Sequence, residues 1–337
     1  MKKRITIALL IFVFLASACG QKNTNLPFLN GDIPTQAPTP TITPTPMPQE
    51  RLSLGEKYII SGDYDAAYEE FQITLAQTTD PEITTAAMLG LGRVLIFKEQ
   101  YRAAIDQFSQ LLTNYPTGLK SRDTAYFFIA KAYEAADQPR LAADAYASYL
   151  TILPGLLDSE IQVMRGDALM DANDPSSALT VYEQALSTST SETYDEIQIK
   201  RSYAAVGMGD DAKAISILID LYNSSSSGYY KAQANLLMGQ IYLRLGQPEQ
   251  AYTRFQDSIT YYPEYYDSYS GLVARVEAGE IVDNRQRGIT DYFAGQYAVA
   301  VQALDQYLLE TSSHDGSAHY YKALSLYEIG DYQGEID

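Results

Sequence analysis

The chain has 337 residues, with 24 Lys and Arg against 42 Asp and Glu, which gives a formal net charge of −18. Proteins that bind nucleic acid need a basic face to neutralise phosphates, so this charge argues against nucleic acid as a partner. A single Cys excludes an internal disulfide, and two His residues leave little for a metal centre. The length suits two average domains or one elongated array.

The first 18 residues have the pattern of an export signal. Lys2, Lys3 and Arg4 precede an unbroken apolar run over residues 5–15. A membrane-spanning helix needs about 20 apolar residues, so this run is too short for a stable anchor. It is typical of a secretory signal peptide. We therefore predict that residues 1–18 are a lipoprotein-type signal peptide.

The junction after this run has two interpretations. Residues 16–18, Ala-Ser-Ala, fit ordinary A-x-A cleavage. Residues 15–19, Leu-Ala-Ser-Ala-Cys, also resemble the bacterial lipobox, in which the Cys is lipidated and becomes the new N-terminus. An odd Cys in an exported chain requires an explanation, and Cys19 is the only thiol, so we expect lipidation of Cys19. The protein would then be held at the outer face of the cytoplasmic membrane or in the periplasm, by a membrane lipid anchor.

The segment after Cys19 is predicted to be a disordered, extended tether that reaches residue 49. It is rich in Thr and shows no hydrophobic period. Its prolines include Pro34, Pro38, Pro40, Pro44, Pro46 and Pro48. Proline fixes φ and removes a backbone donor, so alternating prolines favour an extended, semi-rigid chain.

One pattern recurs from residue 50 to the end. A small residue is followed by a turn with Gly, Asp or Pro, then by an Ala, and four places later by an aromatic or aliphatic residue. The Ala positions are Ala67, Ala104, Ala142, Ala178, Ala214, Ala251 and Ala300. The steps between them are 37, 38, 36, 36, 37 and 49. Such a period is typical of a helical repeat.

This unit, with Leu-Gly, Tyr, Ala, Phe and Pro in order, resembles the tetratricopeptide repeat. The resemblance implies an all-α fold, a right-handed α-solenoid of antiparallel helix pairs with a concave inner face. About seven repeats and an incomplete eighth would occupy residues 50–337. Glycines such as Gly55 and Gly92 would let two helices approach closely, while Phe71 and Phe108 would fill the hole toward the next unit. Because one pair cannot bury its apolar face alone, stability should come from stacking.

The step of 49 residues predicts one additional helix near residues 266–284. Leu272, Val273, Val276 and Ile281 would form its apolar side, and Gly279 would end it.

Tyrosines gather at the same place. They are Tyr261, Tyr262, Tyr265, Tyr266 and Tyr269. Two interpretations stay open: packing between repeats beside an exposed turn, or an aromatic platform for a sugar or a peptide, because Tyr offers broad contact with a polar tip.

The inner face should be lined by the first helix of each unit. One comparable inward position carries Arg93, Lys131, Asp167, Tyr203 and Gln240. This mixed row does not favour capture of a peptide carboxylate, and it leaves open a broad protein or glycan surface. The sequence holds no G-x-S-x-G, P-loop or H-E-x-x-H motif, so we expect no catalytic, cofactor or metal site.

The leading hypothesis is a membrane-anchored, extracytoplasmic scaffold that binds proteins of the cell envelope. Residues 287–295 and 318–324 are also similar to the helical superhelix of soluble lytic murein transglycosylases. The first helix of unit eight, about residues 318–329, lacks a complete second helix, so more chain is expected to follow. The alternative is thus the non-catalytic N-terminal arm of a peptidoglycan lyase, with peptidoglycan as partner. An outer-membrane assembly lipoprotein is a third possibility.

Overall fold

The computed structural model describes residues 46–313 and 316–334. These residues form sixteen α-helices and no β-strand, which confirms the all-α expectation. The predicted signal peptide, Cys19 and the tether up to residue 45 lie outside the described residues, so export and lipidation stay predictions.

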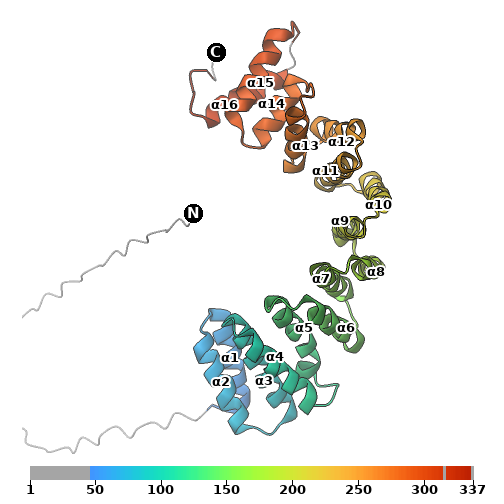
Figure 1. The fold of residues 1–337 in the computed structure, drawn as a ribbon. Coiled ribbons are helices and arrows are strands. Elements are labelled where there is room, and N and C mark those ends of the chain that lie inside the picture. Colours follow the sequence, from blue (N-terminus) through green and yellow to red (C-terminus); the bar gives the residue numbers. More distant parts are fainter. Residues whose placement is uncertain (1–45, 314–315, 335–337) are drawn as a thin grey trace, which may run out of the picture. The chain divides into compact units, whose positions relative to one another are not determined.

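The helices of residues 46–334 follow one another as antiparallel pairs joined by short turns (Figure 1). The first four pairs are α1 (Pro48–Ser61) with α2 (Tyr64–Gln77), α3 (Pro81–Phe97) with α4 (Tyr101–Asn114), α5 (Lys120–Ala135) with α6 (Pro139–Ile152), and α7 (Asp158–Asp171) with α8 (Pro175–Leu186). The later pairs are α9 (Ser191–Gly207) with α10 (Asp211–Ser224), α11 (Gly228–Arg244) with α12 (Pro248–Tyr261), and α14 (Asn284–Phe293) with α15 (Tyr297–Glu310). Two helices stand outside these pairs, α13 (Tyr266–Glu277) and α16 (Gly316–Glu328). No helix in the described part of the chain is both long and apolar enough to cross a bilayer.

The turn inside each pair follows from its residues. Gly62, Gly246 and Gly295 adopt positive φ after a first helix, a conformation that glycine enters without steric cost. The second helix then begins at a capping side chain: Asp63 Oδ1 accepts from the Ala66 amide at 3.1 Å. Three units instead carry Glu99, Asp137 or Asn173 at positive φ. The turn geometry is therefore retained although the residue varies.

Four of the pairs, α1 with α2, α3 with α4, α7 with α8 and α11 with α12, are held by an aromatic ring that lies on a glycine of the facing helix. A Cβ built on Gly92 would lie 2.2 Å from the Phe108 ring, and one on Gly239 would lie 2.1 Å from Phe255. The rings thus fill space inside their own unit, in addition to the expected contact with the next one: the Phe108 ring also stacks on Phe128 of the following unit, with centroids 6.3 Å apart. Phe71 does both, since Cβ atoms on Gly55 and on Gly90 of the following unit would each meet its ring.

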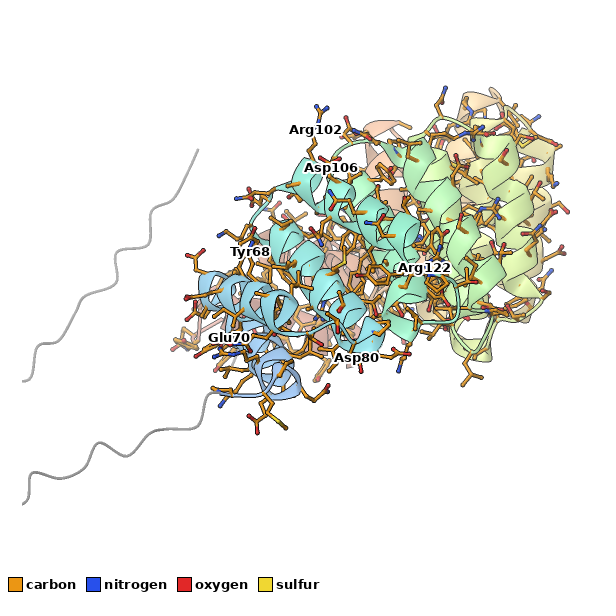
Figure 2. The ribbon with its side chains drawn as sticks, turned by 90° about the horizontal axis from the view of Figure 1, so that it is seen from below. Tyr68, Glu70, Asp80, Arg102, Asp106 and Arg122 are labelled. Carbon is orange, nitrogen blue, oxygen red and sulfur yellow. The ribbon has the colours of Figure 1, made fainter. Side chains whose placement is uncertain are left out.

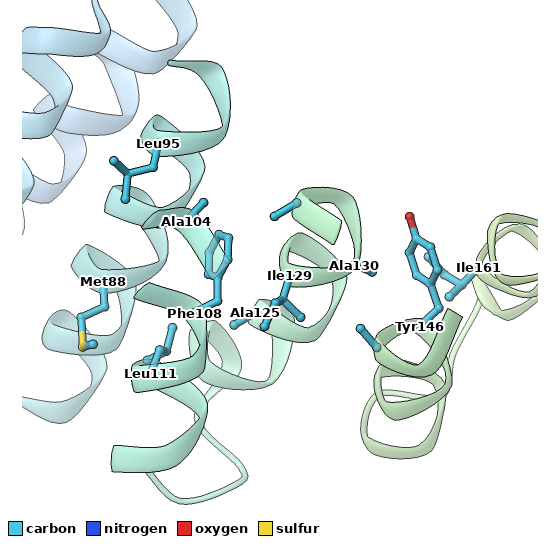
Figure 3. Close-up of a cluster of buried hydrophobic side chains, with 12 residues drawn as sticks. Met88, Leu95, Ala104, Phe108, Leu111, Ala125, Ile129, Ala130, Tyr146 and Ile161 are labelled. Atoms are coloured by element: carbon cyan, nitrogen blue, oxygen red, sulfur yellow. The ribbon is translucent and has the colours of Figure 1, made fainter. Parts of the chain in front are cut away.

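The core runs from unit to unit. Figure 3 shows one stretch in which Leu95, Phe108, Ile129, Tyr146 and Ile161, from five successive helices, are all buried. At the usual transfer free energy, burying a side chain of this size contributes about 2 kcal/mol. Stability therefore depends on neighbouring units covering one another.

Polar side chains stabilise the outer ends of the early helices. Arg122, at the start of α5, is buried and donates to the Leu112 carbonyl at 3.0 Å, and its Nη1 lies 3.0 Å from Asp123 Oδ1. It thereby satisfies a carbonyl of the last turn of α4. Arg102 and Asp106 lie on the exposed side of α4, as Figure 2 shows.

The additional helix α13 lies between α12 and α14 in sequence and packs against α11 and α12. Leu272 is buried on this helix, and Gly279 follows its end with a φ of 78°. The expectation that Ile281 belongs to its apolar side is wrong: Ile281 is 93% exposed, because it lies in the turn between α13 and α14.

Candidate functional site

Three neighbouring cavities follow helices α7, α9 and α11, which lie on the inner side of the curved row of helices in Figure 1. The largest has a volume of about 680 Å³ and is lined by all three helices. It shares Asp167 and Glu196 with a cavity of about 260 Å³. It shares Tyr203 and Val206 with one of about 70 Å³. The cavities therefore adjoin one another, and we call them together the inner groove.

An ion pair bridges α7 and α9 in the groove. Lys200 Nζ lies 2.9 Å from both carboxylate oxygens of Asp167 and 3.7 Å from Glu196 Oε1. The Tyr182 hydroxyl, from α8, donates to Asp167 Oδ1 at 2.7 Å. Asp167 is thus held by two donors, whereas Glu196 has only the longer contact and keeps a side-chain exposure of 53%.

Tyrosines form the apolar part of the groove wall. Tyr203 of α9 and Tyr229 of α11 are 45% and 46% exposed. The Tyr229 ring packs edge-on against Tyr230, with centroids 5.1 Å apart, and against Tyr265 at 6.0 Å. Burial raises the pKa of Tyr203, with smaller contributions from Asp267 and Tyr229. Its phenol therefore stays neutral, and the ring can contact either apolar or cationic groups.

The structure brings together some of the predicted inward row and separates the rest. Asp167 and Tyr203 line the largest cavity, and Gln240 lines the smallest one together with Tyr203. Arg93 lies instead near the N-terminal end of the array, where its Nη1 contacts Glu56 Oε1 at 2.7 Å. Lys131 pairs with Glu134 on its own helix.

The five tyrosines of the predicted platform fall into separate contacts. Tyr261 packs on Tyr262 at 6.3 Å, and Tyr266 packs on Tyr269 at 5.6 Å. Tyr265 contacts Tyr229 of the groove wall. Among these side chains Tyr261 and Tyr266 are the most exposed, at 66% and 70%.

The groove residues that were not anticipated from the sequence include Glu196, Lys200, Tyr229 and Tyr230. A signal for the first two does exist. Positions 196, 200 and 203 are spaced by four and three, so their side chains share one face of a helix. Because Tyr203 was predicted to face inward, the same helix spacing could have placed Lys200 and Glu196 on the inner face of α9 as well.

A second hollow of about 720 Å³ lies beside α12. It is lined by Tyr252, Gln256 and Tyr261 of α12, together with Arg275 and Glu280 after it. Arg275 is 8% exposed and donates to the Ile281 carbonyl at 3.2 Å and to the Gln256 side chain. Burial lowers the pKa of Arg275, partly offset by Glu280. This hollow is more polar than the groove.

Nearby, α14 carries a buried carboxyl group. Asp291 is 4% exposed, and burial raises its pKa to about 6, against the opposing effect of Arg287, whose Nε lies 3.6 Å from Oδ2.

In the described part of the chain no group of three or more His, Cys, Asp or Glu residues could hold a metal ion.

Comparison with known families identifies the repeat. A family model for the tetratricopeptide repeat matches residues 89–156 and 285–337, and a second tetratricopeptide-repeat model matches residues 233–265. The helices that these segments cover, in whole or in part, are α3–α6, α11–α12 and α14–α16. The tetratricopeptide repeats expected from the sequence are thereby confirmed. No curated protein matches the chain.

Solved structures with some similarity are repeat proteins as well. One is a tetratricopeptide repeat protein from Parabacteroides merdae, with 12% identity over 83% of this chain and 98% of that one, and a TM-score of 0.48. MamA has 18% identity over 52% of this chain and 90% of that one, with a TM-score of 0.44. PilF of Pseudomonas aeruginosa has 12% identity over 67% and 97%, with a TM-score of 0.44.

Proposed function

We propose, from the tetratricopeptide repeats of this chain, that the protein is a non-catalytic scaffold whose inner groove binds an extended segment of a partner protein. Repeat arrays present long surfaces on which a partner chain can lie. The observation that carries the proposal is the row of three adjoining cavities along α7, α9 and α11.

The groove has the composition of a protein-binding surface. Tyr203 and Tyr229 provide exposed aromatic area, and Tyr is enriched where proteins recognise one another. The ion pair between Asp167 and Lys200 holds these two side chains in place before a partner binds. The entropic cost of ordering them on binding is therefore small.

A peptide display library tests this proposal. The full chain and its Tyr203→Ala, Tyr229→Ala double variant are used in parallel selections, with a Tyr261→Ala variant as the control for loss of an exposed tyrosine elsewhere. We expect peptides that bind the native chain and the control but not the double variant. If every selected peptide binds all three chains equally, the groove is not the binding surface.

The location of the scaffold is proposed from the sequence. Lipidation of Cys19 would attach the protein to a membrane, and the Pro/Thr-rich segment that follows would hold the repeats away from the lipid. The partners would then be envelope proteins outside the cytoplasm. Mass spectrometry of the mature N-terminus should find acyl mass on Cys19; an unmodified thiol would overturn this part.

The polar hollow beside α12 favours a second candidate function, binding of the cell-wall glycan. It combines Tyr252 and Tyr261 with the amide of Gln256, and aromatic faces with amide and hydroxyl groups suit a sugar. This role would agree with the arm of a lytic transglycosylase. The test is co-sedimentation with purified sacculi, which should be weakened by Tyr261→Ala and not by Tyr203→Ala. No sedimentation of the native chain would exclude the glycan role.

A further inference from the structure

We propose that the inner groove selects a partner segment that carries a Lys or Arg side chain, which enters the largest cavity between Glu196, Tyr203 and Tyr229. This inference rests on the proposed function and specifies the chemistry of the partner. It is drawn from the charges and rings that line the cavities.

The charge in the two larger cavities of the groove is not balanced. Glu160, Asp167 and Glu196 line the two larger cavities, and Lys200 is the one basic side chain that lines them. Lys200 is already held by both oxygens of Asp167, and its contact to Glu196 is longer, at 3.7 Å. One cation from a partner would give Glu196 the close counter-charge that Lys200 gives to Asp167.

Glu160 provides a second, independent indication. Its Oε2 atom is buried and accepts no hydrogen bond from the described residues. Glu160 lines the groove cavity of about 260 Å³, which adjoins the largest cavity of the groove at Asp167 and Glu196. A buried carboxylate oxygen without a donor is unfavourable, so a donor supplied by a ligand would be stabilising.

The tyrosines favour the same ligand. The exposed rings of Tyr203 and Tyr229 line the same cavity as the carboxylate of Glu196. A cation within about 6 Å of such a ring is attracted by its negative face, and Arg also stacks on it. An acidic segment would meet like charge in the cavities and in the whole chain, whose net charge of −18 would steer basic partners toward it.

The test uses the full chain and two sets of short acetylated, amidated peptides. The sets share their sequences, taken from groove-dependent clones of the display selection, except that one has Arg and the other citrulline at the same position. Citrulline keeps the shape of Arg and removes its charge. Affinities are measured by isothermal titration calorimetry. We expect the Arg peptides to bind at least about tenfold more tightly, with the difference reduced at high salt.

Two matched variants assign this preference to the groove. Glu196→Gln should remove most of the Arg-over-citrulline preference, because it neutralises the proposed partner of the cation. Glu69→Gln, at an exposed site on α2, should leave it unchanged. Circular dichroism of both variants checks that the helices remain.

The outcomes separate this inference from the proposed function. Equal affinity for both peptide sets, with both weakened by Tyr203→Ala, would overturn the inference and leave the groove as a protein-binding surface. Binding that Tyr203→Ala does not change would overturn both. An Arg preference that survives Glu196→Gln would contradict the assignment to this cavity.

Discussion

Units one to three (α1–α6) and units four to six (α7–α12) are built from the same repeat, but the side chains on their inner faces make different contacts. In α3, Arg93 is paired with Glu56 of α1 and lies over the Phe128 ring of α5, 5.4 Å from its centroid. In α9 the corresponding position is Tyr203, which is 45% exposed and borders two cavities. At the position of Arg93 the inner face is therefore covered by paired side chains, whereas at the position of Tyr203 it is open to a ligand.

The difference separates two kinds of position in the repeat. Side chains at one kind pack the helix pair, and side chains at the other are proposed to contact a partner. The contact between a glycine and an aromatic ring occurs in both regions, as Gly92 with Phe108 and as Gly166 with Tyr182. The inward positions vary in charge and size without changing the helix pair. The proposed binding surface is thus added on a packing scheme that recurs in both regions.

The largest expected effect comes from removing a shared packing ring. Phe108 is fully buried, so Phe108→Ala should lower the free energy of unfolding by about 4 kcal/mol. Phe97 is 48% exposed and only stacks on Tyr64, so Phe97→Ala should cost about 1 kcal/mol. Urea denaturation of both variants measures this, and equal losses would contradict the assignment of Phe108 to the core.

The second effect concerns the buried carboxyl of α14 and depends on pH. Because the pKa of Asp291 rises from 3.8 to about 6 on folding, the folded chain binds this proton more strongly, and stability falls as pH rises from 4 to 6. Asp291→Asn should therefore stabilise the protein by up to about 3 kcal/mol at pH 7. Below about pH 4 the two chains should converge. A gain that does not change with pH would show that ionisation of Asp291 is not its cause.

A smaller effect tests whether both regions share the glycine contact. Gly92→Ala and Gly166→Ala each place a Cβ within 2.3 Å of a ring. Overpacking costs about 2–3 kcal/mol, and the helix gains about 1 kcal/mol from Ala, so each variant should lose about 1–2 kcal/mol. Gly155→Ala, where a Cβ meets nothing within 4 Å, is the control and should change stability little. Loss in only one of the two regions would break the comparison.

The smallest effect on stability is expected in the groove itself. Tyr203→Ala removes a half-exposed side chain, so thermal denaturation should show a change of about 0.5 kcal/mol or less. The same variant should lose binding of groove-selected peptides. A large loss of stability would mean that Tyr203 serves packing and not recognition.

Much of the fold could be predicted from the sequence, because its determinants are local. The turn residue inside each pair, most often Gly, and the small residue on the first helix recur with nearly constant spacing, and each has one physical purpose. Ile281 was misplaced because an apolar residue in a turn looks the same in sequence as one that continues a helix.

The groove was less predictable, since it depends on contacts between units. The predicted inward row included Asp167 and Tyr203, which line the groove, and also Arg93, which does not. The sequence gave no sign of this difference, because the partner of Arg93, Glu56, is 37 residues away in the chain. Tyr229 and Tyr230 lie at the start of α11 and belong to no recurring pattern. Only the packing of α7, α9 and α11 against their second helices brings these residues to one surface.

Hydrogen–deuterium exchange with and without a groove-selected Arg peptide tests the central claim most directly. The account predicts slower exchange over Asp158–Asp171, Ser191–Gly207 and Gly228–Arg244, with Pro48–Ser61 and Pro81–Phe97 unchanged. Protection confined to these two N-terminal helices, or spread evenly over all units, would contradict it.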